Sequence, residues 1–253
     1  MSIYLLPVIS KLFEKVILKI LEHSDAAKQI NPLQYGFQKG KSCKMFSLLL
    51  QESMDYLCER NSDMYVCYFD ARAAFDNVWT TGLIHKLYNH GIKGKLLRII
   101  NNTFQGAPSR VLYNGYLSET FQMMQGTRQG SICAPFYYII HVIGLLDELQ
   151  RSVHGLRVGE LKLSAPTQAD DIVLLSTLRL GIEKVVSICR NYANKWRYSY
   201  NAAKCASMVM SHKQARRHRP EAIRYDNSNI TETTMYKHLG VTHTVHNPTM
   251  SIR

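Results

Sequence analysis

Two adjacent carboxylates, Asp170 and Asp171, stand directly before an apolar, β-prone run that continues to Ser176. Two unit charges about 4 Å apart repel by roughly 4 kcal/mol at an effective dielectric of about 20. A divalent cation turns that repulsion into a binding site, because Mg²⁺ takes oxygen ligands and is usually held by one or two carboxylates plus substrate phosphates. An ordinary turn is the alternative, since Asp favours turns for its own backbone hydrogen bonding.

A third carboxylate, Asp70, ends the continuous apolar run that begins at Met64. Such a run is typical of a buried strand, which would deliver Asp70 to its C-terminal edge. The residues over 161–168 predict another strand just before the acidic pair, so Asp170 and Asp171 would lie at a hairpin turn. These three acids are the first candidates for chemistry in the chain.

The bulk composition limits the kind of protein that can carry these acids. A length of 253 residues allows one sizeable core or two subdomains. Hydrophobic content of 46% with 20% charged residues is typical of a globular chain and not of a disordered one. A net charge of +12 and a pI near 9.4 favour a polyanionic partner, either nucleic acid or an anionic membrane surface. Plain solubility is the alternative explanation of the charge.

The cysteines and the N-terminal segment indicate a reducing, non-secretory environment. The 6 cysteines never approach C-x-x-C spacing, which argues against a zinc site or a disulfide framework. Lys11, Glu14 and Lys15 interrupt the apolar run at the N-terminus, so a signal peptide is not expected. No segment reaches the roughly 20 apolar residues that span a bilayer. We therefore expect a soluble, intracellular chain with no membrane partner.

Apolar periodicity predicts helices and short strands along most of the chain. Helices are expected over 8–22, 43–60, 81–90, 94–104 and 178–195, and a long helix should begin near Pro135. The inner face of that long helix would consist of Phe136, Ile139, Ile140, Ile143, Leu146 and Leu149. Short strands are expected over 207–210 and 235–240, and over 110–113 and 120–123, joined through Asn114-Gly115.

A basic, glycine-containing segment lies between the first two long helices. Gly36 and Gly40 flank its centre, and glycine permits close approach of the backbone to a ligand. Lys39 and Lys41 supply positive charge for phosphate. The alternative is an ordinary basic loop that leads into the next helix.

Four stretches together carry a family pattern: Phe69-Asp-Ala-Arg-Ala-Ala-Phe-Asp76, Gln125-Gly-Thr-Arg-Gln-Gly-Ser131, Ala169-Asp-Asp171 and Asn201-Ala-Ala-Lys204. In this order they look like motifs A, B, C and D of reverse transcriptases, most closely those of LINE-type (non-LTR) retrotransposons. The segments over 5–17 and 34–40 also resemble that group. His238-Leu-Gly240 resembles the primer-grip hairpin that follows motif D. The resemblance covers nearly the whole chain.

The resemblance implies an α+β fold built around a polymerase palm, an antiparallel sheet backed by helices, with mostly helical fingers. Residues 1–62 would form the fingers, 63–211 the palm with motifs A to D, and 212–253 the end of the palm with the primer-grip-like hairpin. Adjacent strands of the palm sheet would bring Asp70 and Asp170 together. The chain ends soon after the hairpin, so the thumb is expected to be missing.

The resemblance also implies an activity, that of an RNA-directed DNA polymerase. Its partners would be an RNA template, a DNA primer and dNTPs, and the primer 3′-hydroxyl would attack the α-phosphate of a dNTP. Asp70, Asp170 and Asp171, with the backbone carbonyl of Ala71, would hold two Mg²⁺ ions, for which Mn²⁺ is a possible substitute. Lys204 matches the motif D lysine, a candidate general acid for the pyrophosphate leaving group, although a plain surface lysine is the alternative.

Further residues of this sequence match binding positions of the family. Phe75 matches the bulky position that closes against the sugar 2′-carbon and favours dNTPs over rNTPs, with an ordinary core role as the alternative. The remaining nucleotide-binding candidates are Ala71, Arg72, Gln129 and Gly130. The template and primer candidates are Lys39, Lys41, Arg128, Gln168, Leu239 and Gly240.

Departures from the family pattern, which also include Cys43 in place of the more usual Ser or Thr, leave two hypotheses. Gln168 stands where these enzymes usually carry an aromatic or aliphatic residue. Met1-Ser-Ile-Tyr4 stands where they carry Arg-Pro-Ile-Ser, whose arginine would contact the triphosphate. The chain is either the fingers–palm part of an RNA-directed DNA polymerase or an inactive retroelement relic that only binds nucleic acid. A nuclear location is implied only by how such elements integrate.

Overall fold

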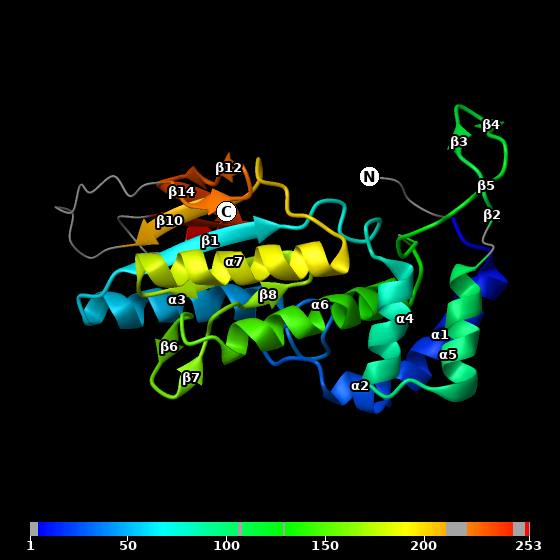
Figure 1. Cartoon of the computed structure of the whole chain (residues 1–253), viewed down its shortest axis with the longest axis horizontal. Coiled ribbons are helices and arrows are strands. Elements are labelled where there is room, and N and C mark those ends of the chain that lie inside the picture. The colour runs from blue at the N-terminus through cyan, green and yellow to red at the C-terminus, as the bar shows by residue number, and fades with distance from the viewer. Residues whose placement is uncertain (1–4, 106–107, 129, 211–221, 245–250, 253) are drawn as a thin grey trace. The chain divides into compact units, whose positions relative to one another are not determined.

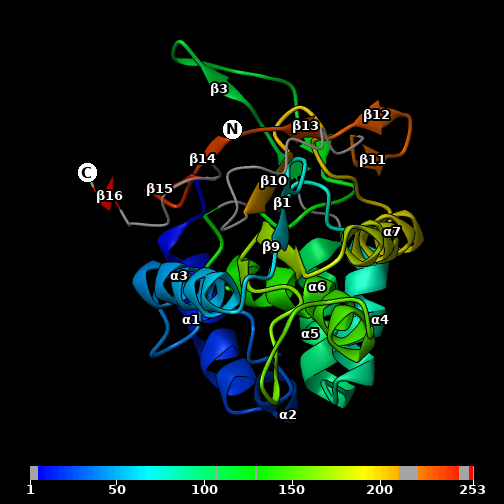
Figure 2. The same cartoon turned by 90° about the vertical axis from the view of Figure 1, so that its left-hand side faces the viewer.

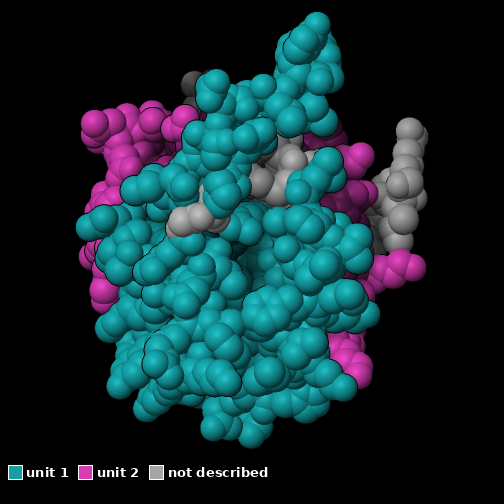
Figure 3. Space-filling view, turned by 90° about the vertical axis from the view of Figure 1, so that its right-hand side faces the viewer, with its two compact units in different colours: residues 1–30, 73–142, 196–198 teal, residues 31–72, 143–195, 199–253 magenta. Residues whose placement is uncertain are grey.

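The computed structural model describes residues 5–105, 108–128, 130–210, 222–244 and 251–252. They form two compact units, which Figure 3 colours separately. Unit 1 comprises residues 1–30, 73–142 and 196–198, and unit 2 comprises 31–72, 143–195 and 199–253. Each unit is therefore built from separate stretches of chain, whereas the predicted division at 62/63 and 211/212 follows the sequence and stays a prediction.

A five-stranded sheet forms the centre of unit 2, in the order β13 (Thr231–Glu232), β10 (Ala206–Met210), β1 (Met64–Asp70), β9 (Asp171–Ser176) and β8 (Thr167–Gln168). β1 pairs antiparallel with both β9 and β10, and β8 pairs antiparallel with β9. The predicted antiparallel sheet is confirmed for these four strands. β13 pairs parallel with β10, so the complete sheet is mixed.

The central strands are apolar on both faces because helices cover both. On one face, Val66, Val173 and Met208 belong to a buried cluster with Phe46 and Leu50 of α3 (Cys43–Glu59). On the other face lies α7 (Arg179–Trp196), whose buried side chains are Gly181, Ile182, Val185, Val186, Cys189, Tyr192 and Ala193. Figure 2 shows α3 and α7 on opposite sides of β1 and β9. This burial explains the continuous apolar run that the sequence shows before Asp70.

The long predicted helix is α6 (Ala134–Arg151), of which residues 134–142 lie in unit 1 and 143–151 in unit 2. Its predicted inner face is buried, but Tyr137, Tyr138, Val142 and Leu145 are buried as well. The predicted inner face is confirmed, and the buried surface of the helix extends beyond it. A helix that is apolar nearly all round is a core helix, and α6 has that character.

Unit 1 contains α1 (Val8–Glu22), α2 (Asp25–Lys28), α4 (Thr80–Asn89) and α5 (Gly94–Phe104), and α4 lies beside α5 (Figure 1). The predicted helix over 8–22 is confirmed. Of the apolar side chains that predicted it, only Ile17 and Leu21 are buried, whereas Val8, Leu12, Phe13, Val16 and Ile20 are exposed.

The short hairpins differ in part from the expected strands. Asn114 and Gly115 close a hairpin, both with positive φ, but it joins β3 (Leu112–Tyr113) to β4 (Tyr116–Leu117). The strand expected over 120–123 is β5 (Phe121–Gln122), which pairs with β2 (Pro108–Ser109) instead. The range 161–168, expected to form one strand, contains two, β7 (Leu161–Lys162) and β8. β7 pairs with β6 (Arg157–Val158).

The remaining strands lie in unit 2. β11 (Arg224–Tyr225) pairs with β12 (Ser228–Asn229), and β14 (Met235–His238) pairs with β15 (Val241–Thr244), which also pairs with β16 (Ser251–Ile252). All 6 cysteines are free. Within the described part of the chain, no helix is both long enough and apolar enough to cross a bilayer.

Candidate catalytic site

The three predicted carboxylates lie at one end of two neighbouring strands in unit 2. Asp70 is the last residue of β1 and Asp171 is the first of β9, and the register places these two residues directly opposite each other. Opposed residues on antiparallel strands have Cβ atoms roughly 4.5–5.5 Å apart. Asp170 belongs to the turn between β8 and β9, so the hairpin expected from the sequence is confirmed.

The turn that carries Asp170 has an unusual backbone. Ala169 has φ +60° although it is not glycine, and its side chain is 8% exposed. A non-glycine residue in this left-handed region costs of order 1–3 kcal/mol and persists only where its surroundings hold it. The turn is therefore kept in place by contacts outside the hairpin itself.

Burial and neighbouring charges raise the pKa of Asp170 and of Asp171. Burial raises the pKa of Asp170, and the Asp70 charge adds to that rise. Burial, followed by the charges of Asp170 and Asp70, raises the pKa of Asp171 to about 6. The Lys204 ammonium opposes both rises, and its Nζ lies 3.5 Å from Asp70 Oδ2. That lysine side chain is 64% exposed, so solvent screens the pair.

This oxygen-only cluster suits a hard cation. Burial and mutual repulsion disfavour the charged carboxylates, and a divalent cation relieves both effects. Among the described residues, no group of three or more His, Cys, Asp or Glu side chains is gathered as a ready metal site. Mg²⁺ does not require one, because it is usually held by one or two carboxylates together with substrate phosphates and water. The donor set fits Mg²⁺ or Mn²⁺ in that partial form.

Backbone contacts join the end of β1 to the segment that carries Lys204. Asn201 N donates to Asp70 O at 2.9 Å, and Arg72 N donates to Ser199 O at 2.9 Å. Ala71 forms an antiparallel bridge with Tyr200. The candidates Asp70, Ala71 and Lys204 are thus brought together within unit 2, and Arg72 is exposed beside them.

In unit 1, the glycine-containing loop of residues 125–131 is attached to the segment that follows Arg72. Thr127 N donates to Phe75 O at 2.7 Å, and Gly126 N donates to Val78 O at 2.9 Å. A Cβ on Gly126 would lie 2.7 Å from Asp76 O, and its φ is +90°, so only glycine fits there. This close approach brings two predicted nucleotide-binding segments together.

The individual candidates in those two segments have distinct environments. The half-buried Phe75 ring stacks on Tyr138 of α6 with centroids 5.1 Å apart. Arg128 Nη2 donates to Thr103 O at 3.1 Å. Gly130 is exposed with φ +104°. Gln129 lies outside the described residues.

The basic segment over 31–41 contacts β8 and the turn that follows it. Tyr35 N donates to Thr167 O at 2.7 Å, and Thr167 N donates to Leu33 O at 2.9 Å. A Cβ on Gly36 would lie 2.2 Å from Ala169 N. Gly36 thus permits close approach to the protein's own turn, whereas the sequence had suggested approach to a ligand.

The two lysines of that segment differ in environment. Lys41 Nζ donates to the carbonyls of Pro32 and Gln34 and lies 4.9 Å from the centroid of the Tyr35 ring. Burial lowers the pKa of Lys41. Lys39 is exposed. Of the two predicted phosphate contacts, Lys39 is the one whose side chain is open to solvent.

Sequence reasoning missed Gln34, which accounts for much of the contact with the turn. Its side chain is fully buried, and its Oε1 accepts hydrogen bonds from Ala169 N at 2.9 Å and Gly36 N at 2.8 Å. The available signal was a polar residue two positions before a glycine, within a segment that the sequence already marks by its glycines, its lysines and its family-like residues 34–40.

The remaining template and primer candidates also lie in unit 2. Gln168 is half-buried and opposes Asp171 in the β8–β9 register. Leu239 and Gly240, with φ +50° and +84°, form the turn between β14 and β15. Tyr236 of β14 stacks on Tyr68 at 4.2 Å, and its hydroxyl donates to Lys204 O at 3.2 Å. The β14–β15 hairpin is therefore anchored beside the lysine segment.

Comparisons with known proteins found a matching family model and similar chains. A family model described as "Reverse transcriptase (RNA-dependent DNA polymerase)" matches residues 1–243. The "RNA-directed DNA polymerase from mobile element jockey" of Drosophila funebris is 30% identical over 94% of this chain and 26% of its own length. The polyprotein of the type-2 retrotransposable element R2DM of Drosophila melanogaster is 23% identical over 69% of this chain and 16% of its own length. The chain thus spans about a quarter or less of these relatives.

Solved structures with a similar fold include telomerases. An apo telomerase from Candida tropicalis, truncated from its C-terminal domain, superposes with a TM-score of 0.61 at 12% identity, over 96% of this chain and 45% of that one. A Candida albicans telomerase in complex with a fragment of telomeric RNA gives a TM-score of 0.60 at 10% identity. At this identity the likeness concerns the fold alone.

Proposed function

Because the chain belongs to the reverse transcriptase (RNA-dependent DNA polymerase) family, we propose that it carries the nucleotide-adding centre of an RNA-directed DNA polymerase from a non-LTR retrotransposon. The central sheet of unit 2 would be the polymerase palm, and the N-terminal helices would belong to the fingers. The single observation that carries the proposal is the β1–β9 register, which places Asp70 opposite Asp171 with Asp170 on the adjoining turn. A nuclear site of action follows only from the way such elements integrate and is part of the proposal.

The proposed reaction is phosphoryl transfer. The primer 3′-hydroxyl attacks the α-phosphate of a dNTP paired with the RNA template, a new phosphodiester bond forms, and pyrophosphate leaves. Two Mg²⁺ ions, when bound, stabilise the attacking and leaving oxygens of such an in-line displacement. Asp70, Asp170 and Asp171 are the proposed carboxylate ligands, with the backbone carbonyl of Ala71 as a further one.

Other side chains are assigned roles by their position in the chain's motifs. Lys204 is the proposed donor of a proton to the pyrophosphate, and its location 3.5 Å from Asp70 supports a role at this end of the sheet. Phe75, Arg72 and Gly130 are proposed to shape the nucleotide pocket, together with Gln129. Lys39, Lys41, Arg128, Gln168 and the Leu239–Gly240 turn are proposed template and primer contacts.

The test is primer extension on an RNA template with dNTPs, comparing the chain with its Asp170→Asn variant in Mg²⁺ and in EDTA. Asparagine keeps the shape of the side chain but removes the charge that a metal needs. We expect extension by the parent chain in Mg²⁺, none in EDTA, and a loss of about 10²- to 10³-fold in the variant. Primer–template binding by the variant should remain.

Two outcomes would count against the proposal. Extension that survives Asp170→Asn would contradict the metal assignment. Tight primer–template binding without extension, also in a chain lengthened at both ends with native flanking sequence, would favour a relic that only binds nucleic acid.

A further inference from the structure

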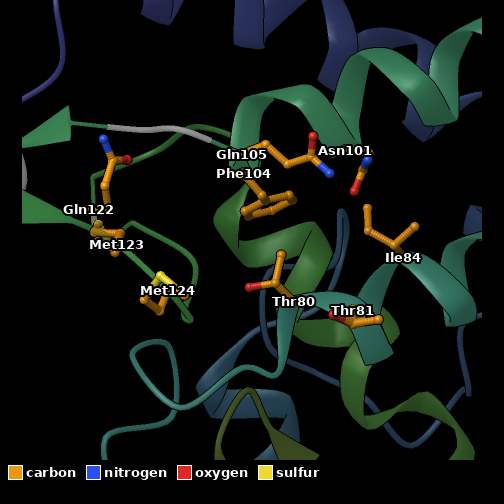
Figure 4. A pocket seen from close by; sticks show the side chains of 9 residues that line it. All are labelled: Thr80, Thr81, Ile84, Asn101, Phe104, Gln105, Gln122, Met123 and Met124. Carbon is orange, nitrogen blue, oxygen red and sulfur yellow. The ribbon is translucent and has the colours of Figure 1, made fainter.

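Unit 1 contains a hollow of about 500 Å³ outside the carboxylate site. It lies between α4, α5 and the segment that follows β5 (Figure 4). None of its 9 lining side chains carries a charge, although the chain as a whole has a net charge of +12. The part of a ligand that enters this hollow should therefore be uncharged.

The lining combines an aromatic ring with three carboxamides. The Phe104 ring lies near the middle of the labelled side chains in Figure 4, and it packs on Tyr137 with centroids 5.5 Å apart. Asn101, Gln105 and Gln122 each offer a donor and an acceptor. Within the part of the chain that the structure describes, no other residue forms a hydrogen bond with these three amide groups.

A cation stands at one end of the hollow. A smaller adjoining hollow shares Thr80, Phe104 and Met123 with the first and is also lined by Arg128. Arg128 uses Nη2 to donate to Thr103 O, and the other nitrogens of its guanidinium fork are further donors suited to a phosphate. A nucleotide has the matching chemistry: its base is flat and neutral with both donors and acceptors, and its phosphate is an anion.

We propose that this hollow binds one unpaired base of a single-stranded nucleic acid, with the base stacked on Phe104 and the adjoining phosphate at Arg128. Asn101 and Gln105, which Figure 4 shows on the same side of the hollow, contact the base edge, since side-chain amides match the donors and acceptors of bases. None of the residues that line the larger hollow is assigned to the nucleotide-adding centre, and the site needs no metal. Only Arg128 is shared with the proposed template contacts, so the site rests in that part on the proposed function. Base–aromatic stacking has a measurable effect on affinity in such sites.

The test is an abasic scan. A single-stranded oligoribonucleotide of about 12 nucleotides is prepared with one abasic position moved along it. Its binding to the chain and to a Phe104→Leu variant is measured by fluorescence anisotropy. We expect one abasic position to weaken binding to the parent chain by about tenfold. Phe104→Leu should weaken binding of the intact oligonucleotide by a similar factor. It should hardly change binding of the abasic oligonucleotide. If Phe104→Leu weakened binding of the intact and of the abasic oligonucleotide by the same factor, the proposal would be overturned.

Neighbouring asparagines provide a second, matched pair of variants that leaves the aromatic packing intact. Asn101 lines the hollow, whereas Asn102 is exposed and does not line it. We expect Asn101→Ala to lower the affinity for the intact oligonucleotide several-fold and Asn102→Ala to leave that affinity unchanged. Equal effects of the two substitutions would contradict the base pocket. None of these measurements depends on polymerase activity.

An independent observation concerns the turn that carries Asp170. The Gln34 amide oxygen accepts from Ala169 N, and the residues on either side of Gln34 pair through their backbone with Thr167. Gly36, without a Cβ, lets the chain approach Ala169 closely. The Ala169 backbone, with its positive φ, is therefore held from outside the hairpin.

From this geometry we infer that Gln34 is a positioning residue, which fixes Ala169 and thereby the direction of Asp170. A neutral acceptor suits the place, because a carboxylate there would add a further like charge near Asp170 and Asp171. This inference deepens the proposed function and rests on it, but its structural part can be measured without any turnover.

The structural part is tested by amide hydrogen exchange in a chain labelled with ¹⁵N-alanine. Gln34→Met keeps the length of the side chain and removes the acceptor, and Gln34→Glu keeps an acceptor. We expect exchange at Ala169 to accelerate about tenfold in Gln34→Met and to be restored in part in Gln34→Glu. Ala206, in β10 of the same sheet, provides the internal control and should not change.

The catalytic part is tested by measuring kcat and the KM for the dNTP separately in primer extension. Gln34→Met should lower kcat with little change in KM for the dNTP, because binding groups are untouched. Equal acceleration of exchange at Ala169 and Ala206, or unchanged exchange at Ala169, would overturn the positioning role. An inactive parent chain with selective loss of protection at Ala169 would count against the proposed function and not against the contact.

Discussion

At the scale of single residues, the candidate site combines side chains that sequence reasoning selected with one that it passed over. Strand pairing places Asp70 opposite Asp171, Asp170 lies on the adjoining turn, and the sequence motif had selected all three. Gln34 was quoted only as part of a segment, yet it is fully buried and bonded to the turn before Asp170. Its role could not be predicted from the neighbouring sequence, because the hydrogen-bond partner of a buried amide can lie far away in the chain.

Phe75 provides a test of sugar selection. Its half-buried ring stacks on Tyr138, so the Phe75→Val variant removes bulk without removing a charge or a hydrogen bond. If Phe75 closes against the 2′-carbon, the variant should use rNTPs about 10- to 100-fold better relative to dNTPs. The measurement is the ratio of kcat/KM values for the two nucleotides. A loss of activity that is equal for both would instead identify Phe75 as a packing residue.

At the scale of elements, the helices and strands follow from apolar periodicity, whereas their partners do not. Residues 110–113 and 120–123 both contain strands, yet each pairs with a segment other than the one expected. The apolar stripe of α1 correctly predicted a helix, but most side chains of that stripe are exposed. Periodicity reports that a face is apolar, but only the packing decides what covers it.

The packing of α3 on the sheet of unit 2 can be tested with two neighbouring residues. Phe46 is fully buried, and its ring lies 5.6 Å from Tyr35 and 5.3 Å from His238, measured between centroids. Phe46→Ala should lower the free energy of unfolding by about 3–5 kcal/mol, because it leaves a cavity. Met45→Ala, at a position that is 49% exposed, should change it by less than about 0.5 kcal/mol. Urea titration measures both, and similar losses would contradict the packing.

At the scale of the whole molecule, charge and buried histidines govern the response to solution conditions. A net charge of +12 accumulates on a chain whose central strands and core helix are almost free of charge. The positive residues are therefore concentrated on the surface, where they attract a polyanion. The buried histidines have the opposite consequence, since they favour the folded state only while they remain neutral.

Nucleic-acid binding should weaken steeply with salt. Each phosphate neutralised by a lysine or arginine contributes about −0.9 to the slope of log K against log salt concentration on duplex DNA, and about −0.7 on single strands. Lys39→Gln removes an exposed, predicted phosphate contact and should make the slope shallower by about one unit. Lys28→Gln is the matched control, because Lys28 is paired with Asp25 at 2.9 Å. Identical slopes for the two variants would exclude Lys39 from the interface.

Stability should fall in mild acid because of His141. Burial, together with the Lys86 ammonium, lowers the pKa of His141 to about 3 from an ordinary value of 6.5. Between these values the unfolded chain binds a proton that the folded chain does not, so the free energy of unfolding decreases as pH falls below about 6.5. His141→Phe should flatten this loss by up to about 1.4 kcal/mol per pH unit.

The measurement is the urea midpoint between pH 7.5 and 5, with His154→Phe, at an exposed position, as the control. Some pH dependence should remain in His141→Phe, because burial also lowers the pKa of His238 to about 4 and lowers that of His243. An unchanged pH profile in the His141 variant would show that this imidazole is not the group that titrates.

The sequence by itself determined the family, the order of the carboxylate motifs and the type of most elements. These depend on local information, namely residue type, spacing and apolar periodicity. Only the tertiary structure decided that Asp70 faces Asp171, that Gln34 holds the turn before Asp170, and that an uncharged hollow lies beside Phe104. Strand register, close backbone approach and cavities arise from contacts between residues far apart in the chain, and no local pattern encodes which of the possible partners will meet.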